Sequence, residues 1–109
     1  MAYPTRGSLI SKAEADILVN AFQASPAHFN GVSGGFYGKE LIQTLLSQPG
    51  CDGLRYYHGL GPDPYDGKKI KHTIILVAED NKGNLLTGAI LEIGPLCPPY
   101  CPSANTLGS

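Results

Sequence analysis

The chain carries little net charge and has no long apolar segment. Lys and Arg total 8 against 9 Asp and Glu, so the formal net charge is −1. Proteins that bind nucleic acid through its phosphates usually carry a clear surplus of basic residues. A membrane-spanning helix needs roughly 18 or more consecutive apolar residues, and no run in this sequence approaches that length. The composition therefore predicts neither a nucleic-acid partner nor a membrane span.

Cysteines are also few, and their number is odd. Cys51, Cys97 and Cys101 are the only three, which argues against a small secreted scaffold held together by disulfides. Residues 1–10 contain neither the apolar segment nor the cleavage site of a secretory signal peptide. These two features predict a cytoplasmic protein whose cysteines are free thiols or metal ligands.

The residues that are present fit one folded domain with many turns. The length of 109 residues matches the usual size of a single domain, and 14 glycines and 9 prolines provide frequent chain reversals. We expect an N-terminal arm at residues 1–10, a single domain at residues 11–94 and a C-terminal arm rich in Pro and Cys at residues 95–109.

Two helices are predicted in the first half of the chain. Ser11 and Glu14 have the spacing of a capping box, which predicts a helix from Lys12 to Gln23. A second helix is expected from Lys39 to Gln48, because Pro49-Gly50 would end it. Each segment carries an apolar stripe at helical spacing, formed by Ala13, Ile17, Leu18, Ala21 and Phe22 in the first and by Leu41, Ile42, Leu45 and Leu46 in the second.

The second half is predicted to form strands. Leu54–His58 alternates in character, His72–Glu79 is rich in aliphatic and β-branched residues, and Leu85–Ile93 follows a hairpin turn at residues 80–84. Gly59–Lys71 is dense in turn-forming residues and is expected to be a loop. The predicted fold class is α+β, with two N-terminal helices packed on one face of a three-stranded antiparallel meander and an extended Pro-rich C-terminal arm.

The predicted strands are apolar on both faces. A sheet covered on one side should alternate apolar and polar residues, whereas strict alternation here places Ile75 and Val77 opposite Ile74 and Leu76. Two short helices cover only one face of three strands, so the other face needs the terminal arms or a second copy of the chain. The residues expected at such an interface are Ile75, Val77, Leu86 and Ile90 on the sheet, and Leu96, Pro98, Pro99 and Tyr100 on the C-terminal arm.

Cysteine and histidine residues suggest a different function. Cys51, Cys97 and Cys101 with His58 or His72 would supply a Cys3His zinc site. Pro98-Pro99 favours polyproline II geometry, which would hold the Cα atoms of Cys97 and Cys101 about 12 Å apart unless a cis-proline turn intervenes. The favoured interpretation is therefore three small buried hydrophobic residues. Cys51 as a nucleophile would need His58 or His72 within hydrogen-bond reach.

Three stretches resemble a group of small uncharacterised bacterial proteins. They are residues 50–57 (GCDGLRYY), residues 72–84 and the arm Pro95–Cys101. Members of that group pair a short helical half with a strand-rich half and a closing Cys-Pro-Pro-aromatic-Cys arm. The resemblance implies no activity, ligand or catalytic residue.

The function predicted from the sequence is a non-enzymatic structural or interaction module that self-assembles through an apolar sheet face and its terminal arms. No cofactor is required for that role. The alternative is a small zinc-binding or thiol-dependent protein that uses the cysteines and a histidine. A third and weaker hypothesis is a ligand-binding or enzymatic role for a dimer groove around Arg55, Tyr57 and His58. An enzyme is less favoured, because the sequence contains no assembled catalytic motif.

Overall fold

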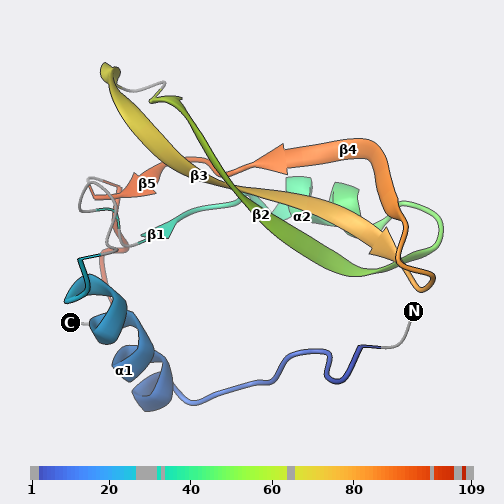
Figure 1. The fold of residues 1–109 in the computed structure, drawn as a ribbon, viewed down its shortest axis with the longest axis horizontal. Coiled ribbons are helices and arrows are strands. Elements are labelled where there is room, and N and C mark those ends of the chain that lie inside the picture. Colours follow the sequence, from blue (N-terminus) through green and yellow to red (C-terminus); the bar gives the residue numbers. More distant parts are fainter. Residues whose placement is uncertain are drawn as a thin grey trace. The chain divides into compact units, whose positions relative to one another are not determined.

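The computed structural model describes residues 3–26, 32, 34–63, 66–98, 100–104 and 107, with the side chains of residues 63 and 66–69 left out. It contains two helices, a three-stranded antiparallel sheet in the order β2-β3-β4 and a two-stranded sheet β1-β5 (Figure 1). The predicted α+β class is therefore confirmed. The elements are α1 (Lys12–Gln23), β1 (Gly34–Gly35), α2 (Lys39–Leu46), β2 (Cys51–Asp63), β3 (Asp66–Asp80), β4 (Leu85–Glu92) and β5 (Leu96–Cys97).

The chain forms two compact units that divide it differently from the predicted boundaries. The first unit holds residues 36–94, with α2 and the three-stranded sheet. The second holds residues 3–35 and 95–109, with α1, β1 and β5. The sequence predicts that both helices pack on the sheet, whereas only α2 belongs to the unit that contains the sheet. An apolar helix face shows that the helix needs a packing partner, but it does not show which element that partner is.

Helix α1 begins at the predicted capping box. The Glu14 backbone N–H donates to the Ser11 hydroxyl at 3.1 Å, and the Ser11 N–H donates to the Glu14 carboxylate at 3.4 Å. These two bonds satisfy donors that the first helical turn leaves without a partner. No residue of α1 is buried, and Ile17 and Leu18 are 68% and 63% exposed.

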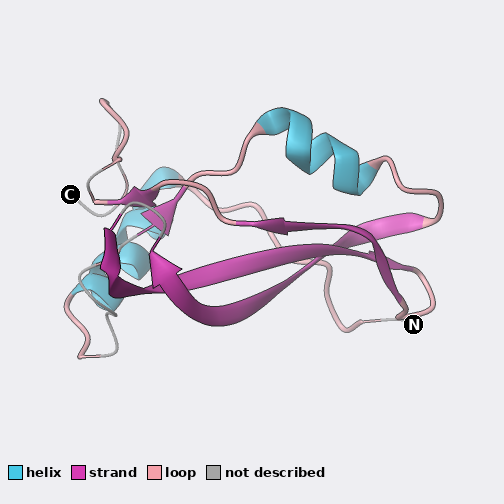
Figure 2. Cartoon of the chain, turned by 90° about the horizontal axis from the view of Figure 1, so that it is seen from above, coloured by secondary structure: helices cyan, strands magenta, loops and turns pink. Residues whose placement is uncertain are grey.

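Helix α2 lies on one side of the three-stranded sheet and contacts all three strands (Figure 2). Its Leu45 is 1% exposed, and Ala78 of β3 is fully buried. Ile90 and Tyr57, which project from the other face of the sheet, are exposed. The exposures indicate that α2 covers the face that carries Ala78. Tyr37, two residues before α2, donates its hydroxyl to the Ile74 carbonyl at 2.7 Å, and burial raises the pKa of this phenol.

Strands β2 and β3 form one long hairpin, and the predicted loop at 59–71 is wrong. Pairing continues from Tyr57 opposite Ile75 through Gly59 opposite Thr73 to Pro62 opposite Ile70. Pro62 is tolerated because β2 is an edge strand, where a missing N–H costs no ladder hydrogen bond. Gly59 has a packing role as well, since a Cβ there would lie 3.0 Å from Thr73 Cγ2. Local turn propensity is overridden here by a cross-strand partner.

Strand β4 contains a large bulge that changes which residues share a face. Val77 pairs with Ile90, yet the next residue, Ala78, pairs with Leu86. The three residues 87–89 of β4 therefore have no opposite residue in β3. Neighbouring residues of a strand point to opposite faces, so Leu86 and Ile90 lie on opposite faces of the sheet. The prediction that they share one face is wrong, because strict alternation takes no account of a bulge.

The C-terminal arm is a closed loop rather than an extended segment. β5 pairs with β1 through Gly34 opposite Cys97 and Gly35 opposite Leu96. A disulfide joins Cys97 and Cys101, whose Cα atoms are 4.7 Å apart, and the Cys97–Pro98 peptide bond is cis. The Tyr100 N–H donates to the Leu96 carbonyl at 3.0 Å across this turn. The expected separation of about 12 Å is wrong, because it assumed a trans polyproline geometry.

Among the residues that the structure describes, no helix combines the length and the apolar character needed to cross a membrane.

Candidate functional site

His58 of β2 and His72 of β3 form a cross-strand pair. His58 lies opposite Ile74 and His72 lies opposite Leu60, so the two histidines are diagonal neighbours on one face. His58 Nδ1 and His72 Nε2 are 2.9 Å apart, which is a hydrogen-bond distance. One of the two nitrogens donates this bond and the other accepts it. The rings are 5.1 Å apart between centroids and inclined by 28°.

A tyrosine next to this pair orients one of the rings. Tyr56 meets His58 edge to face, with a centroid distance of 5.4 Å and an interplanar angle of 89°. Tyr56 is 61% exposed and His58 is exposed, whereas His72 is half-buried. The pair is therefore ordered by ring contacts and backbone register, and it remains open to water.

The five predicted metal ligands do not gather at one point. Cys51 pairs with Asp80, eight residues along β3 from His72, which corresponds to about 26 Å at the rise of an extended strand. Cys97 and Cys101 are joined in a disulfide and offer no thiolate. Within the described part of the chain, no group of three or more His, Cys, Asp or Glu side chains is placed to hold a metal ion. The structure brings together His58 and His72 from the predicted set.

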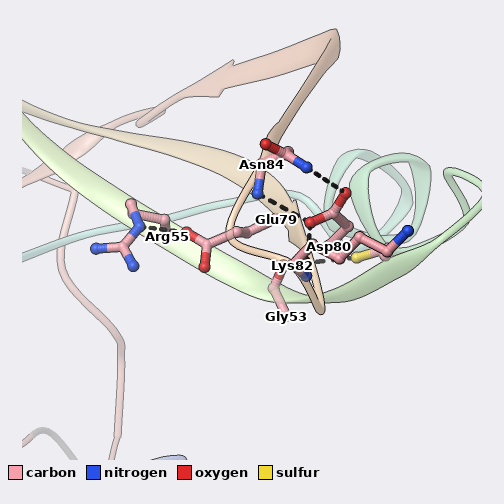
Figure 3. A network of polar contacts seen from close by, with 7 residues as sticks. Gly53, Arg55, Glu79, Asp80, Lys82 and Asn84 are labelled. Carbon is pink, nitrogen blue, oxygen red and sulfur yellow. Dashed lines mark hydrogen bonds and ion pairs between the residues drawn. The ribbon is translucent and has the colours of Figure 1, made fainter. Parts of the chain in front are cut away.

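Arg55 and Glu79 form an ion pair on the opposite face of the sheet from the histidines. The Arg55 Nε donates to Glu79 Oε1, and Figure 3 shows this contact, with the two terminal nitrogens of the guanidinium group pointing away from Glu79. The Glu79 side chain is 8% exposed and the Arg55 side chain 41% exposed. A carboxylate so far removed from water is costly without a cationic partner. Arg55 therefore has a structural role in this half of the sheet.

Apolar side chains surround this ion pair. The register places Tyr57, Ile75, Val77, Leu85 and Ile90 on the same face as Arg55, Glu79 and the exposed Glu92, and we call the five uncharged residues the apolar face. Val77 lies between Arg55 and Ile90 and is only 3% exposed. Ile90, Tyr57 and Leu85 are 58%, 47% and 39% exposed. Water thus reaches the margins of the apolar face, while its centre is buried.

The predicted interface residues fall into several environments. Ile75, Val77 and Ile90 belong to the apolar face, whereas Leu86 is on the side covered by α2. Leu96 is buried at 7% exposure. Pro98 and Tyr100 are exposed on the disulfide loop, and Pro99 lies outside the described residues.

The turn between β3 and β4 borders a hollow of about 370 Å³. The Asp80 carboxylate accepts the backbone N–H groups of Lys82 at 2.9 Å and Asn84 at 2.8 Å (Figure 3). The Asn84 N–H is the main reason why the pKa of Asp80 is lowered, and the Lys82 backbone and charge contribute less. Gly83 has a φ of +87°, a left-handed conformation that favours glycine. Asp80 thus stabilises the turn that the sequence predicted.

The free thiol of Cys51 lines the same hollow. Cys51 is half-buried, and its Sγ lies 3.5 Å from the Gly53 carbonyl oxygen. The residues that line the hollow are Gly50, Cys51, Asp52, Asp80, Asn81 and Lys82, none of which is a histidine. His58 and His72, the bases required for a cysteine nucleophile, are in the distant part of the hairpin, so Cys51 is not brought into reach of either.

Two buried polar residues were not identified from the sequence. Lys71 is 4% exposed and donates its Nζ to the Ile93 carbonyl at 3.0 Å. Thr73 is 5% exposed, and its Oγ1 is buried without a hydrogen-bond partner. The alternation of side chains along β3 places Lys71 and Thr73 on one face. This placement was missed because Lys71 was predicted to lie in the loop at residues 59–71.

Comparison of the chain with models of protein families, with curated proteins and with solved structures yields no match. The resemblance to small bacterial proteins thus stays a prediction.

Proposed function

We propose that the chain is a non-enzymatic interaction module that associates with a second copy of itself through the apolar face of its sheet. The observation that carries the proposal is the exposure of Ile90, Tyr57 and Leu85 around the buried Val77. Exposed apolar side chains that gather on one face mark protein interaction sites more often than ordinary surface. A second copy would remove these margins from water.

The edge of the sheet supports a second copy as the partner. β2 runs for 13 residues and has a strand neighbour on one side only within the described residues. An exposed strand edge pairs readily with another strand, and two identical edges meet antiparallel about a two-fold axis. Tyr57 of the apolar face is a residue of this edge strand. Edge pairing and face contact would therefore be neighbouring parts of one interface.

The terminal arms carry further apolar side chains, which the sequence predicts to take part in self-assembly. Tyr100 is 54% exposed on the loop closed by the disulfide, and Leu9 and Ile10 of the N-terminal arm are exposed. A loop constrained by a disulfide loses little conformational freedom when it binds. Each of these arms would offer a second copy a contact of its own.

Sedimentation velocity at tens of micromolar protein tests the proposal. The unmodified chain should sediment as a dimer or larger assembly, and Ile90→Asp should sediment as a monomer because it places a charge in the interface. Leu41→Asp is the matched control, since Leu41 is an exposed apolar residue of α2 at 49% exposure and lies outside the apolar face. A monomeric unmodified chain, or equal effects of both variants, would contradict the proposal.

The cytoplasmic location expected from the sequence stays a prediction. It can be tested through the redox state of Cys97 and Cys101, which form a disulfide in the structure. Disulfides persist in oxidising compartments and are rare in the cytoplasm. Thiol alkylation in intact cells, followed by mass spectrometry, should modify all three cysteines in a reducing compartment. Modification of Cys51 alone would instead indicate that the Cys97–Cys101 bond exists in the cell and that the protein is in an oxidising compartment.

A further inference from the structure

We propose that His58 and His72 form a two-histidine binding site for a divalent transition metal ion such as Ni²⁺, Cu²⁺ or Zn²⁺. The site lies on the β2-β3 hairpin beyond the region paired with β4. Both ligands belong to one chain, so the site is independent of self-association and of the cysteines.

The distance between the two nitrogens suits two ligands of one ion. With metal–nitrogen distances near 2.0–2.1 Å, two nitrogens at a right angle about a metal are about 2.9 Å apart, and two at a tetrahedral angle about 3.3 Å. His58 Nδ1 and His72 Nε2 are 2.9 Å apart. The pair already has the spacing of neighbouring ligands in a square or octahedral complex, and a movement of about 0.4 Å reaches the tetrahedral value.

Binding requires a change of tautomer and no net transfer of protons or electrons. In the hydrogen-bonded pair one of the two facing nitrogens carries the shared proton. A metal ion needs the lone pairs of both facing nitrogens, so that proton leaves and the same ring is protonated on its other nitrogen instead. His58 then binds through Nδ1 and His72 through Nε2, and water completes the coordination.

The hairpin holds the ligands in place and leaves them accessible. The register places His58 and His72 one diagonal step apart on a continuous ladder, and the Tyr56 ring lies against His58. Because His58 is exposed, an ion reaches the pair without opening the core, and a small rotation of the ring directs its lone pair. Imidazole ligands favour copper, nickel and zinc over hard ions such as Mg²⁺ and Ca²⁺. The site is therefore selective by ligand chemistry.

Calorimetric titration of the untagged, disulfide-bonded chain with NiCl₂ tests the proposal. We expect one ion per chain, and at least tenfold weaker binding for His58→Ala and for His72→Ala. MgCl₂ should give no binding. Equal affinity in the unmodified chain and either variant would overturn the assignment.

Two control variants address other possible ligands. Cys51→Ser removes the free thiol, about 26 Å away along the strand, and His28→Ala removes the third histidine of the sequence. Both should bind Ni²⁺ within twofold of the unmodified chain. A tenfold loss in either control would show that the ion binds elsewhere.

Nitrogen NMR of the unmodified chain keeps the proposal testable if a histidine variant fails to fold. Addition of Zn²⁺ should shift the ¹⁵N resonances of His58 Nδ1 and His72 Nε2 together, with the remaining imidazole nitrogens protonated. Unchanged resonances at saturating Zn²⁺ would overturn the site. Sedimentation with and without Zn²⁺ separates this result from the proposed self-association, because the two-histidine site needs no second copy.

Discussion

The two halves of the β2-β3 hairpin have the same backbone pairing but differ in what covers them. In the half near α2, β3 pairs with both β2 and β4, and Val77, Ala78 and Glu79 are buried. In the other half, β3 has no β4 partner over residues 66–74, and Leu60 and Ile70 are 69% and 54% exposed, although Lys71 and Thr73 on the other face of β3 are buried. Two-stranded ribbons are only marginally stable alone. The comparison teaches that ladder pairing sets the shape of the hairpin, whereas a third strand and a helix provide its core.

The largest expected effect comes from emptying the core of the covered half. Leu45→Ala should lower the free energy of unfolding by about 3 kcal/mol, because it removes three carbon atoms from a side chain that is 1% exposed. Leu41→Ala on the same helix should change it by less than about 0.5 kcal/mol, since Leu41 is 49% exposed. Urea denaturation followed by circular dichroism measures both. Similar losses in the two variants would mean that α2 does not form the core of this half.

The next effect comes from the ion pair on the apolar face. Arg55→Ala should destabilise the chain by about 2 kcal/mol, because it leaves the largely buried Glu79 carboxylate without its guanidinium partner. The double variant Arg55→Ala with Glu79→Gln should recover part of this loss, since no buried charge remains. If the double variant has the same free energy of unfolding as Arg55→Ala in urea denaturation, the loss comes from the packing of Arg55 over Val77 and not from the ion pair.

A smaller effect is expected from the uncovered half. His58→Ala, measured without metal, should lower the global unfolding free energy by less than about 1 kcal/mol, the usual range for one cross-strand pair. Amide exchange should speed up in residues 58–62 and 70–74 and stay unchanged in residues 76–79, because the uncovered half opens locally. A uniform increase along the hairpin would show that the two halves unfold as one unit.

The smallest effect concerns the turn at the end of the covered half. The pKa of Asp80 in the folded chain lies below the ordinary value of an aspartate, so its contribution to stability is present above that ordinary value. This contribution is lost as the pH falls through the folded-state pKa. In Asp80→Asn the melting temperature should therefore fall less between pH 7 and pH 3 than in the unmodified chain. An equal fall in both would assign the acid sensitivity to other carboxylates.

The candidate sites were only partly predictable. His58 and His72 were chosen from the sequence as metal ligands, yet their pairing depends on a ladder that continues through residues read as a loop. The cysteines were grouped with them by residue type alone. Residue type shows what a side chain can bind, while only the register shows which side chains meet.

Local signals in the sequence determined the helices, the turn at residues 80–84 and the strands of the covered half, because caps, apolar periodicity and turn residues act within a few positions. Only the tertiary structure decided how far the hairpin extends, which face Leu86 occupies and how closely Cys97 approaches Cys101. These features depend on partners far away in the sequence, on a bulge that reverses the alternation and on one peptide bond geometry. Contacts of this kind are set by pairing in space, which no short stretch of sequence specifies.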